Sequence, residues 1–394
     1  MSEPLHVRWI GPFAKRTGYG QATHDYLLAL HLAGVSLDIQ PLHDADSEDL
    51  DPRYGALLDL VGPKKPPTHI VVHTIPRYAN EFVTGDLAPT SGIRKVCVTT
   101  WETNRFPKED AKRLDQAFDL VIVPSEFCRR SMIQAGLPTT KVWGIPHTFD
   151  PRFWILPKDH YEDQAARSPY IFYSILSWTD RKNPIGLLKA YLSEFRASDD
   201  VHLRIVSPVV NEDDITTLVR CMGLDDLPSV EFLGRHDQKG RLSETDLRHI
   251  HYDSDCYVSA SRGEGWGLGA FEAACVGNPV IVPGFSGWTD YLDDYSNKEY
   301  IGGFPTPAVT PEVKIGKGLD IGGIHITSMA SGAPTGIAGD QDWWEPNLAD
   351  LKSAMRAAYK RRQAKSSVDQ GRFVERFGYS TIGGKWWPVL ENLQ

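Results

Sequence analysis

Cysteine is scarce in this chain, and the common metal-binding patterns are missing. The five cysteines are scattered and lie mostly in apolar segments, which favours free thiols in a reducing compartment over a disulfide framework. The sequence has neither CxxC nor HExxH, so no zinc site is expected. Asp44–Asp46 has the spacing of a DxD metal motif, but no strand precedes it and a solvated loop is favoured. We expect no metal and no other cofactor.

Long apolar runs and excess positive charge are also absent. No segment approaches the ~18 apolar residues of a membrane span, and the first residues lack a signal-peptide pattern, so a cytoplasmic protein with at most peripheral membrane contact is expected. The net charge of −9 argues against a broad nucleic-acid interface, although a small local one stays open. Four cations could face a membrane or nucleic acid, but such pairs usually lie on a solvated surface: Lys64, Lys65, Arg129 and Arg130.

Strand and helix patterns alternate along most of the 394 residues, which are enough for two domains. The strands expected in the first half are 5–10, 35–41, 68–73, 95–100, 120–123 and 141–145. After a polar linker at 151–169 the alternation restarts, with strands expected at 170–176, 201–206, 230–233 and 278–282. The pattern predicts an α/β protein with two doubly wound domains facing each other across a cleft. We place the domains at 1–155 and 170–375, with a helix in 376–394 packing back on the first.

One stretch, Ser259–Glu272 (SASRGEGWGLGAFE), combines features that indicate a ligand site. It is expected to leave a strand and open a helix. Its glycines occupy alternate positions: Gly263, Gly265, Gly267 and Gly269. Such glycines let backbone N–H groups approach a phosphate, and a helix N-terminus adds partial positive charge. Glu264 and Glu272 suit hydroxyl groups instead, because a carboxylate can accept two hydrogen bonds from a vicinal diol. A ligand with both phosphates and hydroxyls is a nucleotide sugar.

The same stretch resembles the donor site of a large family of retaining nucleotide-sugar glycosyltransferases with an E-x7-E signature. This glycosyltransferase family 4-like group includes sucrose synthase relatives and bacterial mannosyltransferases. TDRKNPIGLLKAY (Thr179–Tyr191) and DWWEPNLADL (Asp342–Leu351) resemble further blocks of a subgroup that acts on bacterial surface polysaccharides. The first half is similar only in element order and in WETNRFP and VPSEF. The resemblance implies the GT-B fold, with two Rossmann-like domains and the nucleotide sugar held chiefly by the second.

The resemblance also implies roles for individual residues. Glu264 would contact hydroxyls of the donor sugar, and Glu272 would contact those of the ribose. Arg181 and Lys182 would neutralise the leaving diphosphate, a task that Lys15 and Arg16 could share. Cations at a helix start oppose the helix dipole and call for an anion nearby. The other donor-binding candidates lie in three segments: Gly265, Trp266, Gly267, Leu268, Gly269; Gly18, Tyr19, Gly20 in a loop expected to fold over the diphosphate; and Ser286 and Gly287 after Phe285.

Glu102, His73 and His147 are the candidates in the first half of the chain. Many relatives have a histidine where this chain has Trp101 and Glu102. Glu102 could orient the acceptor, stabilise positive charge on the sugar ring, or only cap the next helix. His73 and His147 fall at the ends of expected strands and are our acceptor-side candidates, although a buried core histidine is the commoner fate of such residues.

These observations favour a metal-independent hexosyl- or pentosyltransferase that uses a UDP- or GDP-sugar and retains the anomeric configuration. No covalent nucleophile is evident, so the acceptor would attack the donor sugar on the same face from which the leaving group departs. The acceptor is expected to be a saccharide or a lipid-linked saccharide. Alternatives are transfer to a modified nucleic-acid base, a phosphorylase or epimerase of the same architecture, and a nucleotide-sugar-binding module without catalysis.

Overall fold

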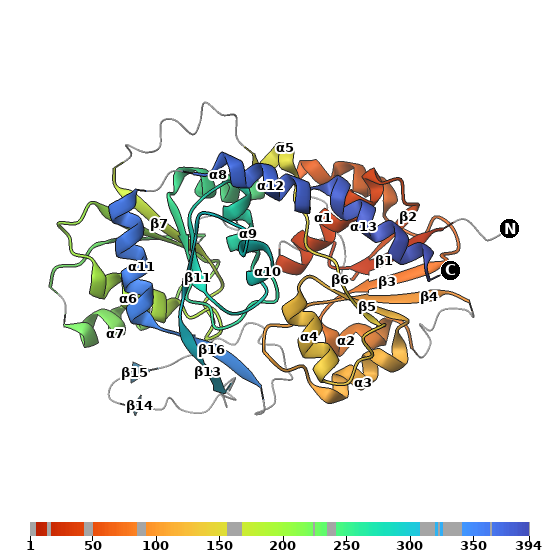
Figure 1. Cartoon of the computed structure of the whole chain (residues 1–394), viewed down its shortest axis with the longest axis horizontal. Coiled ribbons are helices and arrows are strands. Elements are labelled where there is room, and N and C mark those ends of the chain that lie inside the picture. The colour runs from red at the N-terminus through yellow and green to blue at the C-terminus, as the bar shows by residue number, and fades with distance from the viewer. Residues whose placement is uncertain are drawn as a thin grey trace. The chain divides into compact units, whose positions relative to one another are not determined.

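A computed structural model of the chain describes residues 5–13, 17–42, 50–84, 92–155, 168–223, 225–234, 242–307, 320–321, 324–325, 341–362 and 365–393. The chain divides into two compact units: Met1–Trp154 with Gly371–Gln394, and Ile155–Gln370. Each unit contains a parallel sheet with helices on both sides (Figure 1). The two-domain α/β fold predicted from the sequence is confirmed.

The first unit is built on a six-stranded sheet with the order β2-β1-β3-β4-β5-β6, in which every neighbouring pair is parallel. Its strands are β1 (Val7–Gly11), β2 (Leu37–Pro41), β3 (His69–His73), β4 (Arg94–Val98), β5 (Leu120–Val123) and β6 (Val142–Gly144). Its helices are α1 (Gly18–Leu32), η2 (Pro52–Leu60), α2 (Pro76–Ala79), η3 (Asn80–Phe82), α3 (Lys108–Ala117), α4 (Glu126–Gln134), α5 (Pro151–Trp154) and α13 (Tyr379–Glu391). The strand order reverses between β1 and β3, which is where doubly wound folds bind ligands.

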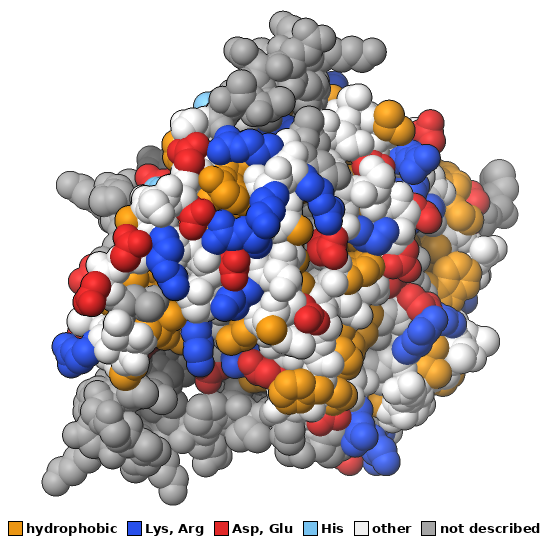
Figure 2. Space-filling view, turned by 60° about the vertical axis from the view of Figure 1, so that its left-hand side comes forward, with side chains coloured by type: hydrophobic (Ala, Val, Ile, Leu, Met, Phe, Trp, Pro, Cys, Tyr) orange, Lys and Arg blue, Asp and Glu red, His pale blue; other side chains and the backbone are white. Residues whose placement is uncertain are grey.

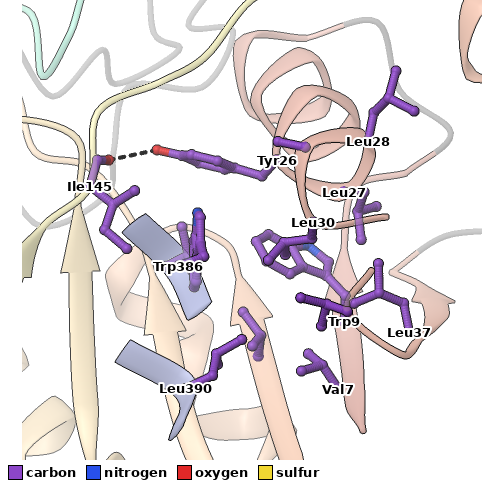
Figure 3. Close-up of a cluster of buried hydrophobic side chains, with 14 of the residues drawn as sticks. Val7, Trp9, Tyr26, Leu27, Leu28, Leu30, Leu37, Ile145, Trp386 and Leu390 are labelled. Carbon is purple, nitrogen blue, oxygen red and sulfur yellow. Dashed lines mark hydrogen bonds between the residues drawn. The ribbon is translucent and has the colours of Figure 1, made fainter. Parts of the chain in front are cut away.

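Helix α13 joins the core of the first unit although it comes from the end of the chain. It lies beside α1 (Figure 1). Trp386 and Leu390 are fully buried and point towards Trp9, with which Trp386 forms an edge-on ring contact at 5.6 Å (Figure 3). Close packing of α13 also requires Gly383, because a Cβ there would meet the carbonyl oxygen of Ala29 at 2.6 Å. Apolar burial therefore ties the C-terminal helix to this unit.

The second unit has a six-stranded parallel sheet with the order β12-β11-β10-β7-β8-β9. Its strands are β7 (Tyr170–Ile175), β8 (Val201–Val206), β9 (Ser229–Leu233), β10 (Cys256–Val258), β11 (Val280–Pro283) and β12 (Lys298–Ile301). Its helices are α6 (Pro184–Glu194), α7 (Glu212–Met222), α8 (Glu244–Asp253), α9 (Leu268–Cys275), α10 (Thr289–Leu292) and α11 (Leu348–Arg361). In chain order this is the 3-2-1-4-5-6 arrangement of dinucleotide-binding folds, with its switch point between β7 and β10.

Two helix ends follow local capping patterns of the sequence. Ser125 caps α4, and Ser243 with Asp246 forms a capping box at α8. Some predictions from the sequence were wrong or incomplete. The segment 151–169 begins with α5 rather than linker, and 156–167 lies outside the described residues. The last strand expected from the sequence is 278–282, yet the chain also forms β12 and an antiparallel pair of β13 (Gly303–Pro307) and β16 (Asp342–Pro346).

The reason for these misses is that their strands are short and irregular in pattern. β13 (GFPTP) contains two prolines and a glycine, which usually mark a turn, and its partner β16 is far along the chain. The described residues of 308–340 form one further short pair, β14 (Asp320–Ile321) with β15 (Ile324–His325). Helix α12 (Ser367–Phe377), which spans the division between the units, was also not predicted.

A buried carboxylate, Asp25 of α1, connects three elements of the first unit. Its Oδ1 accepts hydrogen bonds from the hydroxyls of Tyr54 at 2.9 Å and Tyr379 at 2.7 Å, and its Oδ2 accepts one from Gln21 at 2.8 Å. Burial raises the pKa of Asp25 to about 6, against the opposing charge of Arg53 and the three hydrogen bonds. The folded state therefore binds the Asp25 proton more tightly than the unfolded chain does.

The titration of Asp25 predicts a pH-dependent stability difference between the native chain and Asp25→Asn. A carboxyl group whose pKa is raised by folding stabilises the folded state when it is protonated. This contribution to the free energy of unfolding is fully present below the unfolded-state pKa of about 4 and is lost as pH rises through the folded-state pKa of about 6. The native chain should therefore lose about 2–3 kcal/mol of stability relative to Asp25→Asn over this window. Urea unfolding of both proteins at pH 4 and pH 7 measures it.

Asp38→Asn is the matched control for that measurement. Burial raises the pKa of Asp38, but hydrogen bonds from Arg8, the backbone of Lys64 and His6 outweigh it and lower the value. The contribution of Asp38 to stability is present above the ordinary carboxyl pKa of about 4 and is lost only below it, so the difference between the native and Asp38→Asn proteins should change little between pH 7 and pH 4. A difference between native and Asp25→Asn proteins that does not change from pH 4 to pH 7 would contradict the assignment.

Candidate active site

The switch point of the second sheet brings together the charged residues that the sequence singled out. Arg181 and Lys182 lie in the connection from β7 to α6, and Glu264 lies in the connection from β10 to α9. Because β7 and β10 are parallel neighbours, both connections leave the same edge of the sheet. Arg262 N–H donates to the carbonyl oxygen of Arg181 at 2.7 Å and joins the two connections directly. The β7 and β10 connections therefore form one site.

Glu264 is buried and bonded to both cations. Its Oε2 lies 3.1 Å from Nη1 of Arg181, and its Oε1 accepts a hydrogen bond from Nζ of Lys182. Ser261 Oγ donates to the same Oε1 at 2.9 Å, and Arg181 also donates to the carbonyl oxygen of Gly263 at 2.6 Å. The anion that the Arg-Lys pair required at a helix start is thus present in the chain itself. The three side chains together carry a net charge of +1.

The charge of Glu264 is fixed by these neighbours. Burial alone would raise its pKa, but the charges of Lys182 and Arg181 and the hydrogen bonds of Lys182 and Ser261 lower it to about 2. The contribution of this carboxylate to stability is present above its ordinary pKa and is lost as pH falls through about 2. Glu264 is therefore a carboxylate at every pH at which an enzyme works, and acts as an acceptor of hydrogen bonds only.

A second loop holds the backbone of Glu264 on both sides. Ser286 Oγ accepts a hydrogen bond from the N–H of Glu264 at 3.1 Å, and the N–H of Gly287 donates to the carbonyl oxygen of Glu264 at 2.9 Å. Ser286 is buried and takes a left-handed backbone conformation with φ of 95°. The sequence identified Ser286 and Gly287 as donor-binding candidates, and the structure places them as supports of Glu264.

Arg262 connects this site to β16 and was missed by the sequence reasoning. Its guanidinium donates to both carboxylate oxygens of Glu345 and to the carbonyl oxygen of Asp180. Next to it, the ring of Trp344 stacks on Phe285 with centroids 5.1 Å apart and planes 14° apart. The available signal was the block DWWEP, which was noted only for its resemblance. The β13–β16 pair is therefore fastened to the loop that holds Glu264.

The residues after Glu264 have packing roles that the sequence did not predict. Trp266 is buried with its ring 4.7 Å from that of Tyr291, so it belongs to the core. Gly269 faces Tyr257, whose hydroxyl would lie 2.8 Å from a Cβ. Gly267 is the N-cap of α9, where a glycine leaves the first N–H groups of the helix uncovered by a capping side chain. Leu268 and Gly269 supply these N–H groups, and Gly265 precedes them.

Glu272 lies in α9, and its Oε2 is 3.3 Å from Nε2 of the fully buried His251. Burial and the charges of both Glu264 and Glu272 raise the pKa of Tyr257.

Gly267→Ala should destabilise the second unit more than a left-handed glycine elsewhere. Gly267 has φ of 85°, and a Cβ there would lie 2.9 Å from the ring of Trp288. Gly223 at the end of α7 has φ of 58° with nothing within 4 Å. Gly223→Ala should therefore cost about 1–2 kcal/mol of backbone strain, and Gly267→Ala about 1–3 kcal/mol more. Denaturant unfolding of the two variants compares them, and equal losses would contradict the close packing.

The switch point of the first sheet gathers Tyr19, His73 and His147. Tyr19 accepts a hydrogen bond from the N–H of Thr100 at 3.3 Å, and its ring centroid lies 5.4 Å from that of His73. His73 Nδ1 is 2.8 Å from Thr23 Oγ1, and His147 packs on Tyr26 with centroids 5.3 Å apart. Both histidines are buried, like core histidines.

Burial and the charge of Glu102 raise the pKa of Tyr19, so Glu102 acts on this cluster electrostatically. Burial and the neighbouring His147 lower the pKa of His73, and burial lowers that of His147 to about 3. Both imidazoles are therefore neutral near pH 7.

Gly18, Tyr19 and Gly20 do not form the loop that the sequence predicted. They are the first turn of α1, whose N-cap Thr17 accepts a hydrogen bond from the N–H of Gly20 at 3.1 Å. The capping threonine was overlooked because the glycines suggested a turn. Lys15 and Arg16 lie outside the described residues, as does Asp44–Asp46.

The described ranges hold neither a cluster of metal ligands nor a membrane-spanning helix. No three His, Cys, Asp or Glu side chains there are grouped so that they could hold a metal ion. No described helix is both long and apolar enough to cross a bilayer. All five cysteines are free, and Cys221 is exposed while the other four are buried. The face seen in Figure 2 carries basic side chains interspersed with acidic ones.

Comparisons with known proteins agree with this architecture. Residues 169–303 match the family model described as Glycosyl transferases group 1. Curated protein sequences give no significant match. Among solved structures, Anabaena HepE in complex with UDP and glucose is similar, with a TM-score of 0.64 and 14% identity over 98% of this chain and 100% of that one.

Two further structures span nearly the whole chain. Sucrose-phosphate synthase from Thermosynechococcus elongatus has a TM-score of 0.64 and 13% identity, covering 99% of each chain. A glycosyltransferase from Rickettsia africae has a TM-score of 0.65 and 12% identity, covering 100% of this chain and 99% of that one. The matched segment contains Arg181, Lys182, Glu264 and Glu272. The chain has the GT-B fold, and residues 169–303 of its second unit are similar to the model described as Glycosyl transferases group 1.

Proposed function

We propose that this protein transfers a sugar from a nucleoside-diphosphate sugar to an acceptor hydroxyl, with retention of the anomeric configuration. The observation that carries the proposal is the Glu264 cluster at the switch point between β7 and β10. It combines two cations, a buried carboxylate and a nearby helix start in one site. These are the groups that a diphosphate and a sugar require together.

In this proposal Arg181 and Lys182 bind the diphosphate, and Glu264 accepts hydrogen bonds from sugar hydroxyls. As the bond between C1 and the phosphate oxygen breaks, negative charge grows on that oxygen next to two positioned cations. Such charges lower the barrier because they are in place before the reaction begins. Side-chain cations carry the phosphate charge here, so the mechanism assigns no divalent ion.

The new bond forms on the same face of the donor sugar as the one from which the leaving group departs. The acceptor oxygen attacks C1, and its proton passes to the departing phosphate oxygen, so the nucleoside diphosphate itself accepts the proton. Glu264 cannot take that role, because its pKa of about 2 makes it too weak a base. The chain contributes position and electrostatic stabilisation.

For the acceptor we propose a saccharide or a lipid-linked saccharide, with Glu102, His73 and His147 as the residues to test in the first unit. HepE was solved with UDP and glucose, which makes UDP-sugars the first donors to test and GDP-sugars the second. Nucleotide release from each donor, with products identified by mass spectrometry, distinguishes transfer from phosphorolysis and from binding without turnover.

Glu264→Gln should bind the nucleoside diphosphate with an affinity within about threefold of the native value but lose about 10²–10³ in turnover. Gln keeps the shape but accepts weaker hydrogen bonds from the sugar hydroxyls than the carboxylate does, while Arg181 and Lys182 remain to bind the diphosphate. Nucleotide release at saturating donor measures turnover, and calorimetry measures binding.

Glu231→Gln is the matched control, since Glu231 lies on the edge strand β9 of the same unit and pairs at 2.8 Å with Arg204 of β8, away from the switch point between β7 and β10. It should retain native turnover. Native turnover in Glu264→Gln would exclude the proposed role of this residue.

A further inference from the structure

We propose that His251 is a positioning residue that holds Glu272 in the orientation needed to bind the two hydroxyls of a ribose. The proposal rests on the nucleotide-sugar site proposed above, and it adds a determinant of ribonucleotide specificity from outside that site. Glu272 is in α9, and His251 is in the last turns of α8. The two helices follow different strands, so this contact is made only in the folded chain.

The hydrogen bonds around His251 form a directed series. Asn278 Nδ2 donates to the backbone carbonyl of His251 at 2.7 Å, which fixes the orientation of its amide because a carbonyl can only accept. The same Nδ2 lies 2.7 Å from the hydroxyl oxygen of Tyr173, so its second hydrogen is donated there. The Tyr173 hydroxyl is thereby an acceptor towards Asn278 and has its own hydrogen to donate elsewhere.

The tautomer of His251 follows from that series. Tyr173 Oη and His251 Nδ1 are 2.7 Å apart, so the tyrosine donates and Nδ1 accepts. Burial lowers the pKa of His251, although the nearby Glu272 carboxylate acts in the opposite direction. The lowered pKa keeps the imidazole neutral. A neutral imidazole whose Nδ1 accepts carries its hydrogen on Nε2. Nε2 therefore donates to Oε2 of Glu272, 3.3 Å away.

The surroundings hold His251 still. The imidazole is fully buried, and its ring meets that of Tyr173 edge-on with centroids 5.3 Å apart. Lys365 Nζ donates to the carbonyl oxygens of His251 at 3.0 Å and Tyr252 at 2.9 Å, which fixes the end of α8. A rigid donor acting on one carboxylate oxygen restricts the rotation of the Glu272 side chain.

The other carboxylate oxygen of Glu272 is where a ligand fits. Among the described residues, His251 supplies the one side-chain hydrogen bond to Glu272, whose side chain is 13% exposed. A carboxylate can accept about four hydrogen bonds, so one from His251 leaves capacity for both hydroxyls of a vicinal diol. A nucleotide without those hydroxyls would gain nothing from the orientation of Glu272.

The test compares nucleotides with and without the ribose hydroxyls. Affinities of UDP and GDP and of their 2′,3′-dideoxy counterparts are measured by calorimetry on the full chain. His251→Asn keeps a polar group near the position of Nδ1 but cannot reach Glu272, whereas His251→Gln can place an N–H near that of Nε2. We expect His251→Asn to weaken binding of the ribonucleotide about 10-fold and binding of the dideoxynucleotide less than about twofold. His251→Gln should restore most of the loss.

Glu272→Gln separates this inference from the proposed function. It should reduce the ratio of ribonucleotide to dideoxynucleotide affinity, and adding His251→Asn to it should change the ratio no further. If Glu272→Gln leaves the ratio unchanged, the assignment of the ribose site is wrong and the inference is overturned with it. If Glu272→Gln lowers the ratio and His251→Asn does not, the donor site stands and the positioning role of His251 is overturned.

Tyr173→Phe provides a second variant should His251→Asn fail to fold. It keeps the ring and removes the hydroxyl that donates to Nδ1, so the hydrogen of His251 is no longer confined to Nε2. The ratio should fall about two- to threefold. An unchanged ratio in a folded Tyr173→Phe protein would contradict the series of hydrogen bonds.

Discussion

The buried contact of Glu264 with Arg181 and Lys182 is the interaction on which the rest of the candidate site depends. A carboxylate removed from water is stable as an anion only when cations and hydrogen bonds replace its hydration. The connection after β7 supplies both cations, Arg181 and Lys182. The connection after β10 holds Glu264 together with Ser261, which donates a hydrogen bond to it. Ser286 and Gly287 then fix the backbone, and the cluster is ordered before any ligand arrives.

Both units apply the same topological rule with different side chains. In the second, the strand order reverses between β7 and β10 and charged residues collect there. In the first, it reverses between β1 and β3, and the side chains there are the buried, neutral His73 and His147 and the partly buried Tyr19. Charged groups suit a diphosphate, whereas neutral hydroxyl and imidazole groups suit an uncharged ligand such as a sugar. The chemistry of each unit thus agrees with its proposed ligand.

The sequence predicted most strands of the two parallel sheets, because these depend on local patterns, but it missed β12 and the β13–β16 pair. It also shows the local capping residues Ser125 and Ser243, and it singled out Arg181, Lys182 and Glu264 as site candidates. It could not predict what those residues contact. Arg262 contacts Glu345, which is 83 positions later in the chain, and His251 contacts Glu272 from another helix. Contacts between residues so far apart in the chain produce no periodic pattern in the sequence. The glycines misled us in part: Gly269 makes room for Tyr257, and Gly18 and Gly20 belong to a helix.

A crystal structure of the protein with an unreacted nucleotide-sugar analogue tests the central claim most directly. The account predicts diphosphate oxygens within hydrogen-bonding distance of Arg181 and Lys182, sugar hydroxyls on Glu264, and ribose hydroxyls on Glu272. A nucleotide bound elsewhere, with the contacts of Glu264 to both cations unchanged, would contradict it.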